Sequence, residues 1–168
     1  MTAVLCVLGP WAFVLPFSPV PLSLCTLGIY FAAIILGPKY STVSVLLYLL
    51  LGMIGLPVFT GFIGGPAKLF GPTGGYLFGY IFIAFICGLF TKHFRGKPVL
   101  SFLGMCLGTA ICYLLGTIWL MHQLNISYRE ALLIGVLPYL VLDIIKILLA
   151  ATTGDKLYKA LLRARLIN

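Results

Sequence analysis

The sequence predicts an all-α integral membrane protein, and three observations support that prediction. Of the 168 residues, 62% are hydrophobic and only 8% are charged, whereas a soluble domain carries about 25% charged residues. The apolar residues form long runs, and because backbone polar groups in lipid must bond to one another, such runs indicate helices. The alternation that a membrane β-barrel requires is missing from these runs. We therefore expect a single domain built as one helix bundle.

Pro, Gly and charged residues divide the chain into six apolar stretches, which predicts a six-transmembrane-helix bundle. The expected spans are roughly 2–16, 22–37, 40–56, 74–91, 98–122 and 131–153, followed by a basic tail at 154–168. The first stretch lacks the basic front and the small-residue cleavage site of a signal peptide. We expect it to be the first membrane helix.

Positive charge is concentrated on one side of this topology. Only Lys68 and Arg129 fall on the opposite side, and Lys146 lies within a span. The remaining basic residues lie in two loops and the tail: Lys39, Lys92, Arg95, Lys97, Lys156, Lys159, Arg163 and Arg165. Cytoplasmic loops are rich in Lys and Arg, so both termini are expected in the cytoplasm. The aromatic residues do not interleave with a basic stripe, which argues against nucleic-acid binding.

Asp143 and Lys146 are the most unusual residues of the chain, because they stand inside the last apolar run. Residues three apart share one face of a helix, and a lone charge at membrane depth costs roughly 2.5–3.5 kcal/mol on insertion scales. A helix that begins near Pro138 would place them about 7–12 Å below its outer end. The pair could bind a polar ligand, or it could be a salt bridge that only fixes helix packing.

The segment from Gly55 to Tyr76 is expected on the external side. It holds seven glycines before Tyr76 and three prolines, yet it is too apolar for a disordered linker, which would be polar. We expect it to fold back against the bundle. It either covers a ligand, since glycine lets the backbone approach closely, or serves as a structural turn. The external connection at residues 15–21 is expected to face the same pocket.

Small residues recur every four positions at Gly104, Gly108, Cys112 and Gly116. Such stripes allow close approach of helices in lipid, either inside this bundle or against another membrane subunit. The chain has no P-loop, nucleophile elbow or zinc-protease motif, and its cysteines lack metal-ligand spacing. We expect no metal or resident cofactor, and an energised transport cycle would need partner subunits.

Several strings of the sequence resemble one known family in the same order. They are Pro19-Val-Pro-Leu22, Leu36-Gly-Pro-Lys39, Tyr48-Leu-Leu-Leu-Gly-Met-Ile-Gly-Leu-Pro-Val-Phe59, Gly64-Gly65, Gly71-Pro-Thr-Gly-Gly-Tyr-Leu77 and Pro138-Tyr-Leu-Val-Leu-Asp-Ile-Ile-Lys146. The chain is similar, over nearly its whole length, to the BioY family of biotin-specific S components of energy-coupling factor (ECF) transporters.

The resemblance implies a six-helix S-component bundle that crosses the bacterial plasma (inner) membrane and binds biotin at its outer side. It also implies partners, namely an ECF transmembrane coupling subunit and two cytoplasmic ATPase subunits. Asp143 would accept hydrogen bonds from the ureido N–H groups, Lys146 would bind the carboxylate or balance the acid, and Lys68 is a second candidate for the carboxylate. The remaining candidate binding residues are Tyr48, Phe59, Gly64, Gly65, Thr73, Gly74, Gly75 and Tyr76.

Two positions depart from the family pattern. Cys25 stands where a glutamine is expected, so one polar contact is missing, and Ala3 is followed four residues later by Val7, which breaks a small-residue docking motif. The alternatives to a biotin-binding subunit are an S component for another vitamin, a membrane enzyme that uses Asp143 and Lys146 as acid and base, and a structural scaffold subunit.

Overall fold

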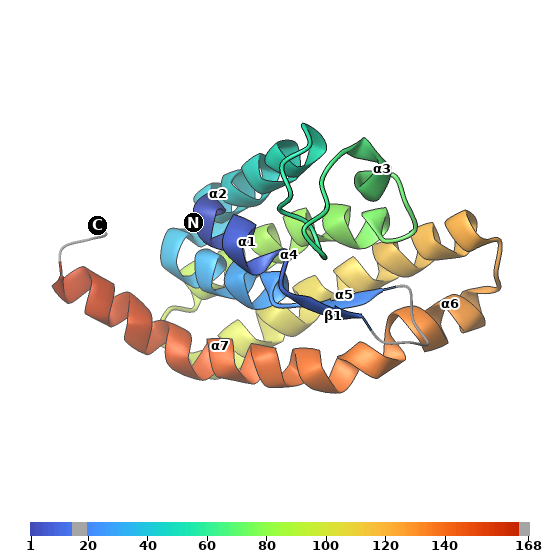
Figure 1. Cartoon of the computed structure of the whole chain (residues 1–168). Coiled ribbons are helices and arrows are strands. Elements are labelled where there is room, and N and C mark those ends of the chain that lie inside the picture. Colours follow the sequence, from blue (N-terminus) through green and yellow to red (C-terminus); the bar gives the residue numbers. More distant parts are fainter. Residues whose placement is uncertain (15–19, 165–168) are drawn as a thin grey trace.

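The computed structural model of the protein describes residues 1–14 and 20–164 and is almost entirely helical (Figure 1). The elements in chain order are α1 (Thr2–Leu8), β1 (Ala12–Val14), β2 (Pro21–Ser23), α2 (Cys25–Met53), α3 (Pro66–Leu69), α4 (Gly74–His93), α5 (Pro98–Leu124), α6 (Tyr128–Gly135) and α7 (Leu137–Arg163). Within the described part, the helices α2, α4, α5 and α7 are long and apolar enough to cross a membrane. The all-helical prediction is confirmed in outline, but a count of six spans is not.

The prediction of one helix over residues 2–16 is wrong beyond Leu8. Pro10, two residues further on, has no backbone N–H to continue the helical ladder. The chain instead forms a two-stranded antiparallel hairpin in which Ala12 pairs with Ser23 and Val14 pairs with Pro21. Residues 15–19, which were predicted to be an external connection, lie outside the described residues. The hairpin packs beside the start of α2.

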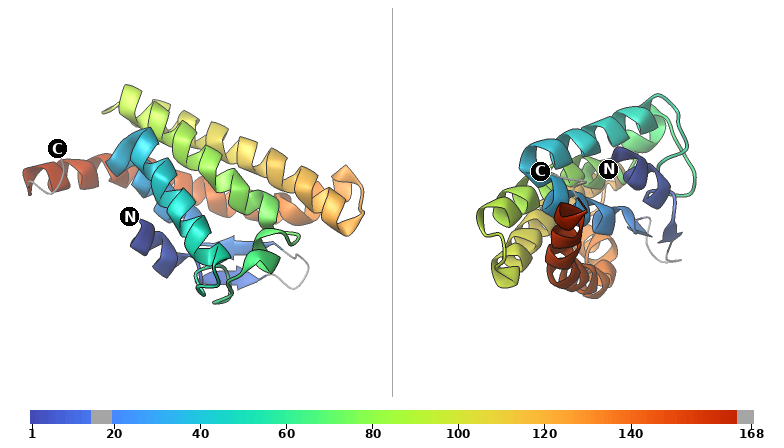
Figure 2. Two further views of the ribbon diagram at one scale, coloured as in Figure 1. Left: turned by 90° about the horizontal axis from the view of Figure 1, so that it is seen from above. Right: turned by 90° about the vertical axis from the view of Figure 1, so that its left-hand side faces the viewer.

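The second and third predicted spans are the two arms of α2, joined by a kink at Gly37 and Pro38. Gly37 has φ +73°, a conformation that costs glycine little, and Pro38 cannot donate to the preceding turn. The Ser41 hydroxyl lies 2.6 Å from the Gly37 carbonyl and 3.1 Å from the Ala84 carbonyl of α4. Figures 1 and 2 show the two arms pointing in different directions from this kink.

The last predicted span and the tail are also divided differently in the structure. Val136 separates α6 from α7, and Pro138 stands in the first turn of α7, where its missing N–H is no loss. The helix then continues through the predicted tail to Arg163, because that segment consists largely of good helix formers such as Lys, Leu and Ala. Residues 165–168 lie outside the described residues.

The core is a close seam between α4 and α5, onto which α2 and α7 pack. A Cβ atom added at Gly116 would lie 2.3 Å from the Tyr76 ring of α4, and one at Gly104 would lie 2.3 Å from Phe90. Without side chains at these positions the helices approach closely. Internal packing is therefore the role of the Gly104–Gly116 stripe.

The loop from Ile54 to Gly65 folds back on the bundle, as the sequence predicted. Phe59 is fully buried against Gly52 and meets the Tyr48 ring edge-on at 5.6 Å. The Tyr48 hydroxyl donates to the Val58 carbonyl at 3.1 Å, and the Gly61 N–H donates to the Pro10 carbonyl at 3.1 Å. The loop is thus attached to α2 and to the segment that follows α1.

Candidate functional site

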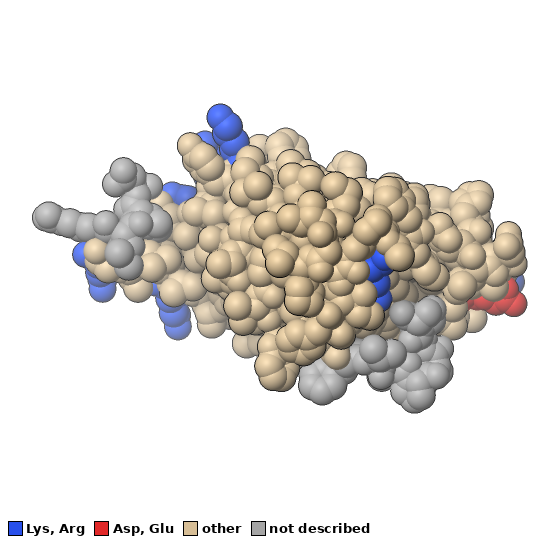
Figure 3. Space-filling view, turned by 45° about the horizontal axis from the view of Figure 1, so that its top comes forward, with Lys and Arg blue, Asp and Glu red and all other residues tan. Residues whose placement is uncertain are grey.

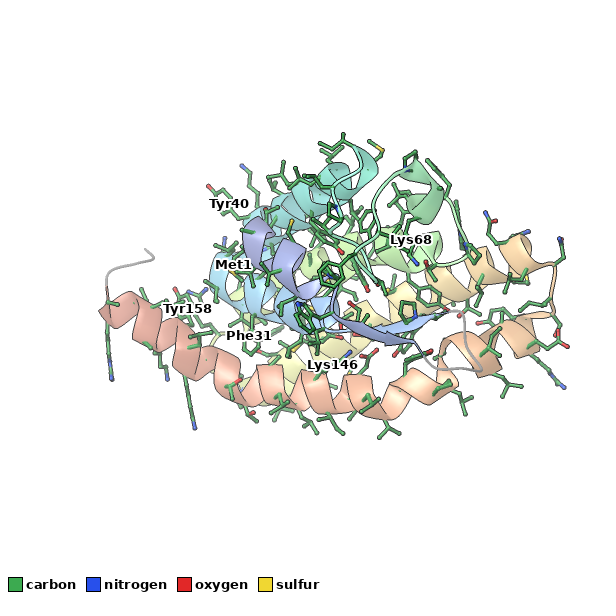
Figure 4. The ribbon with its side chains drawn as sticks, viewed as in Figure 1. Met1, Phe31, Tyr40, Lys68, Lys146 and Tyr158 are labelled. Atoms are coloured by element: carbon green, nitrogen blue, oxygen red, sulfur yellow. The ribbon has the colours of Figure 1, made fainter. Side chains whose placement is uncertain are left out.

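The Asp143–Lys146 pair lies on the inward face of α7. Only 7% of Asp143 and 8% of Lys146 are exposed, and Lys146 Nζ lies 2.8 Å from Asp143 Oδ1. Both residues follow the helix start at Pro138 by one to two turns, so they share a face, as the sequence predicted. This face points toward the β-hairpin and the first turn of α2, as the position of Lys146 in Figure 4 shows.

The Lys146 ammonium has two more partners at the point where the hairpin joins α2. Nζ lies 2.7 Å from the Ser23 carbonyl and 3.2 Å from the Thr26 hydroxyl. An ammonium has three N–H donors, and here all three are used within the protein. Lys146 therefore neutralises Asp143 and connects α7 to the hairpin, with no donor left over for a ligand.

The second carboxylate oxygen of Asp143 accepts a hydrogen bond from the Tyr113 hydroxyl of α5. The sequence interpretation missed Tyr113. A signal was present, because Thr109 and Tyr113 stand four apart in an apolar run and polar side chains in membrane helices usually face the bundle interior. A second tyrosine, Tyr139 of α7, donates to the Val20 carbonyl of the hairpin. Asp143 is thus contacted from two helices, by Tyr113 of α5 and by Lys146 of α7.

A small cavity of about 40 Å³ lies beside the ion pair, and we call it the Asp143 cavity. The hairpin, α2, α4, α5, α6 and α7 all contribute to its walls. Its lining residues are Val20, Pro21, Ser23, Thr26, Tyr76, Tyr80, Ile83, Thr109, Cys112, Tyr113, Gly135, Tyr139, Asp143 and Lys146. Sites that enclose small molecules usually measure roughly 300–1,000 Å³, so side chains around this cavity must move before a vitamin-sized ligand can fit.

A second cavity of about 20 Å³ adjoins the first, and we call it the Lys68 cavity. The two cavities share Val20, Pro21, Tyr76 and Tyr80. The lining residues specific to the second cavity are Phe59, Thr60, Lys68, Thr73 and Leu77. Together the cavities form one elongated space with the Asp143–Lys146 ion pair at one end and the Lys68 ammonium at the other.

Lys68 belongs to the short helix α3, outside the candidate membrane spans, and extends toward the bundle (Figure 4). Its side chain is about half-buried, and this desolvation lowers the pKa of its ammonium. Burial disfavours the charged form of an amine unless an anion compensates it. The position suits an anionic group of a ligand.

The structure brings six of the predicted binding residues to this elongated space. Asp143 and Lys146 line the Asp143 cavity, Tyr76 lines both cavities, and the Lys68 cavity is lined by the other three: Phe59, Lys68 and Thr73. The Tyr76 hydroxyl is buried and has no hydrogen-bond partner among the residues that the structure describes. An unsatisfied buried hydroxyl costs about 1–3 kcal/mol.

The other predicted residues line neither cavity. Tyr48 is buried beneath the loop, as described above. Gly64 and Gly74 are packing positions, because an added Cβ would lie 2.2 Å from the Leu56 carbonyl oxygen and 1.8 Å from the Leu69 carbonyl oxygen, respectively. Their direct contact with a ligand stays a prediction.

Two further glycines have structural roles. Gly65 has φ +100°, and its N–H donates to the Gly52 carbonyl at 2.7 Å. Gly75 packs on Trp119. Cys25, where the resemblance led us to expect glutamine, is fully buried and lines neither cavity.

These features define a multi-pass membrane protein with a buried ion pair beside small cavities that its helices and loops enclose. The model of the BioY family matches residues 1–163. The biotin transporter BioY of Thermotoga maritima is 39% identical over 155 residues, which covers 92% of this chain and 90% of the relative. The biotin transporter BioY2 of Lactococcus lactis subsp. cremoris is 35% identical over 159 residues, covering 95% and 86%.

A solved structure extends the similarity to the fold. The crystal structure of the S-component for biotin from an ECF-type ABC transporter has a TM-score of 0.86 to this chain at 35% identity, covering 94% of this chain and 86% of that one. The chain belongs to the BioY family.

Proposed function

We propose that the protein is the substrate-binding membrane subunit of a biotin uptake system, and not an enzyme. The observation that carries this proposal is the buried Asp143–Lys146 pair at one end of an elongated site, in a chain whose relatives are named biotin transporters. Biotin has a ureido group at one end and a carboxylate at the end of its side chain. The elongated site has a hydrogen-bond acceptor, Asp143, at one end and an ammonium, Lys68, at the other, which suit these two groups.

The contacts of the charged residues decide which end of biotin each residue is assigned to bind. Asp143 can accept N–H donors from the ureido group, an arrangement strengthened by the charge. Because Lys146 uses its three donors on Asp143, Ser23 and Thr26, we assign it the role of balancing the acid. We then assign the biotin carboxylate to Lys68. The rings of Tyr76 and Tyr80, which line both cavities, flank the apolar middle of the ligand.

The finer assignments are part of the same proposal. We place both termini in the cytoplasm, because Lys and Arg gather at the end of the molecule that carries Met1 and the C-terminal turns of α7, as Figures 3 and 4 illustrate. Biotin then enters from the outside. An ECF transmembrane coupling subunit and two ATPase subunits would supply the energy, since the chain itself has no P-loop.

The test is a titration of the purified protein with biotin, its methyl ester and other vitamins. We expect tight biotin binding, strong loss in Asp143→Asn, and binding unchanged in Asp155→Asn, which alters an acid at the cytoplasmic end of the same helix. Preference for another vitamin would support the alternative of a different S component. Equal affinity of wild type and Asp143→Asn would refute the site.

A further inference from the structure

Tyr113 lies between the Asp143 cavity and a further pocket on the side of the bundle, which is distinct from the Lys68 cavity. This lateral pocket lies between α5 and α7 and has a volume of about 220 Å³. It shares Thr109, Tyr113 and Asp143 with the Asp143 cavity. Its other walls are apolar and include Leu140 and Ile144, which are 43% and 38% exposed on the outer face of α7. In a bilayer this pocket opens toward lipid.

The hydroxyl of Tyr113 makes one of the two side-chain contacts of the Asp143 carboxylate among the described residues. A carboxylate offers about four lone-pair sites, and the torsion that turns its plane has a broad, soft minimum. Lys146 takes one site on Oδ1 and Tyr113 takes one on Oδ2. These two contacts together fix the carboxylate plane, and among the residues that the structure describes no other hydrogen-bond donor reaches either oxygen.

We propose that Tyr113 is a positioning residue for ligand binding: its hydroxyl orients Asp143 so that the carboxylate can receive two neighbouring N–H donors of the ligand. This inference rests on the proposed function, since the ureido group of biotin is the group that presents those donors. It adds a residue of α5 to a recognition unit otherwise built on α7 and the hairpin.

The opposite role makes a different prediction. Tyr113 could occupy the position on Oδ2 that a ligand N–H needs, in which case removing its hydroxyl would strengthen binding. The structure favours orientation, because the hydroxyl uses one acceptor site of Oδ2 and leaves the other open. The sign of the effect on affinity therefore decides between the two roles.

The experiment compares wild type, Tyr113→Phe and Tyr158→Phe. Phenylalanine keeps the ring between the two spaces and removes only the hydroxyl. Tyr158 is the matched control, since its hydroxyl also makes a side-chain hydrogen bond, which it accepts from Arg95, but at the proposed cytoplasmic end of α7. Each protein is checked for a single monodisperse species and then titrated with biotin, biotin methyl ester, and two biotins methylated on one or the other ureido nitrogen.

We expect Tyr113→Phe to bind biotin about tenfold more weakly, as loss of a hydrogen bond to a charged group implies, and Tyr158→Phe to match wild type. For one of the two N-methyl biotins the loss caused by Tyr113→Phe should be clearly smaller than for biotin, whereas for the ester it should be the same. A merely structural role would weaken all four ligands by one common factor.

The inference is overturned if Tyr113→Phe stays within about twofold of wild type, if it binds biotin more tightly, or if the factor is common to all ligands. Failure of wild-type protein to bind biotin would instead refute the proposed function, so the two failures are distinguishable.

Discussion

Replacement of Lys146 by methionine should destabilise the protein strongly. The substitution keeps an unbranched side chain of similar length but removes the positive partner of Asp143, of which only 7% is exposed. Three contacts disappear, at 2.8 Å to Asp143, 2.7 Å to Ser23 and 3.2 Å to Thr26. The carboxylate keeps only its contact with Tyr113.

The size of the loss follows from these contacts. Removing one partner of a buried ion pair costs about 3–5 kcal/mol, because the other charge stays buried without compensation. The loss at Thr26 adds little, since its hydroxyl also donates to the Ser23 carbonyl at 3.3 Å. When both charges are replaced by apolar residues, as in Asp143→Leu with Lys146→Met, no uncompensated charge stays buried. The remaining cost is that the polar groups which bonded to Asp143 and Lys146 lose a hydrogen bond, at about 1–3 kcal/mol for each buried group. The double variant should therefore be more stable than Lys146→Met alone.

The assay is reversible denaturant unfolding in mixed micelles, followed by far-UV circular dichroism, with Lys159→Met as an exposed control on the same helix. A loss below about 1 kcal/mol in Lys146→Met, the range of an exposed ion pair, would refute the reasoning. So would a double variant as unstable as the single one, because that would show that uncompensated charge is not the cause.

Three further predictions concern other parts of the site and fold. Lys68→Gln should bind biotin about tenfold more weakly than wild type, but it should bind biotin methyl ester as well as wild type does. In wild type, affinity for biotin should fall as pH rises through the lowered pKa of the Lys68 ammonium. A titration series that shows the same pH profile in Lys68→Gln would contradict the assignment. Gly74→Ala should destabilise the protein by about 1–3 kcal/mol, because its Cβ would lie 1.8 Å from the Leu69 carbonyl oxygen; an unchanged unfolding curve would show that α3 yields freely. At the start of α6, Ser127 donates to Glu130 from its N–H and hydroxyl and lowers the pKa of that carboxyl. This support is present above the ordinary Glu pKa of about 4.3 and is lost as pH falls through the lowered value. The hydrogen-exchange protection factors of α6, in which the intrinsic pH dependence of exchange is divided out, should therefore fall at acid pH in wild type and change little in Glu130→Gln.

The sequence was most informative where the relevant geometry is local. Asp143 and Lys146 share a face because they are three residues apart on one helix, and no distant contact is needed to know that. The burial of Phe59 was also accessible, because an apolar, glycine-rich loop cannot remain exposed to water without cost.

Long-range partners could not be predicted in the same way. Tyr113 lies 30 residues from Asp143, and Ser23 lies 123 residues from Lys146; many hydroxyls in apolar runs could equally have filled these roles. The β-hairpin was missed because a three-residue strand has too few positions to show alternation. The sequence shows where the glycines of the loop are. It does not show whether a glycine makes room for a ligand or, like Gly74, for the carbonyl group of a neighbouring residue.

The glycine-lined seam between α4 and α5 limits how this molecule can change shape. Two helices whose backbones touch along their length cannot slide or tilt relative to each other without steric collision, so they act as one rigid body. The helix α7 also packs on the core through Ile147 and Ala150, but hydrogen bonds of Lys146 and Tyr139 join it to the hairpin, and these can break and re-form. Displacements that admit or release cargo should therefore belong to α7 and the hairpin, with the α4–α5 unit as the stationary frame.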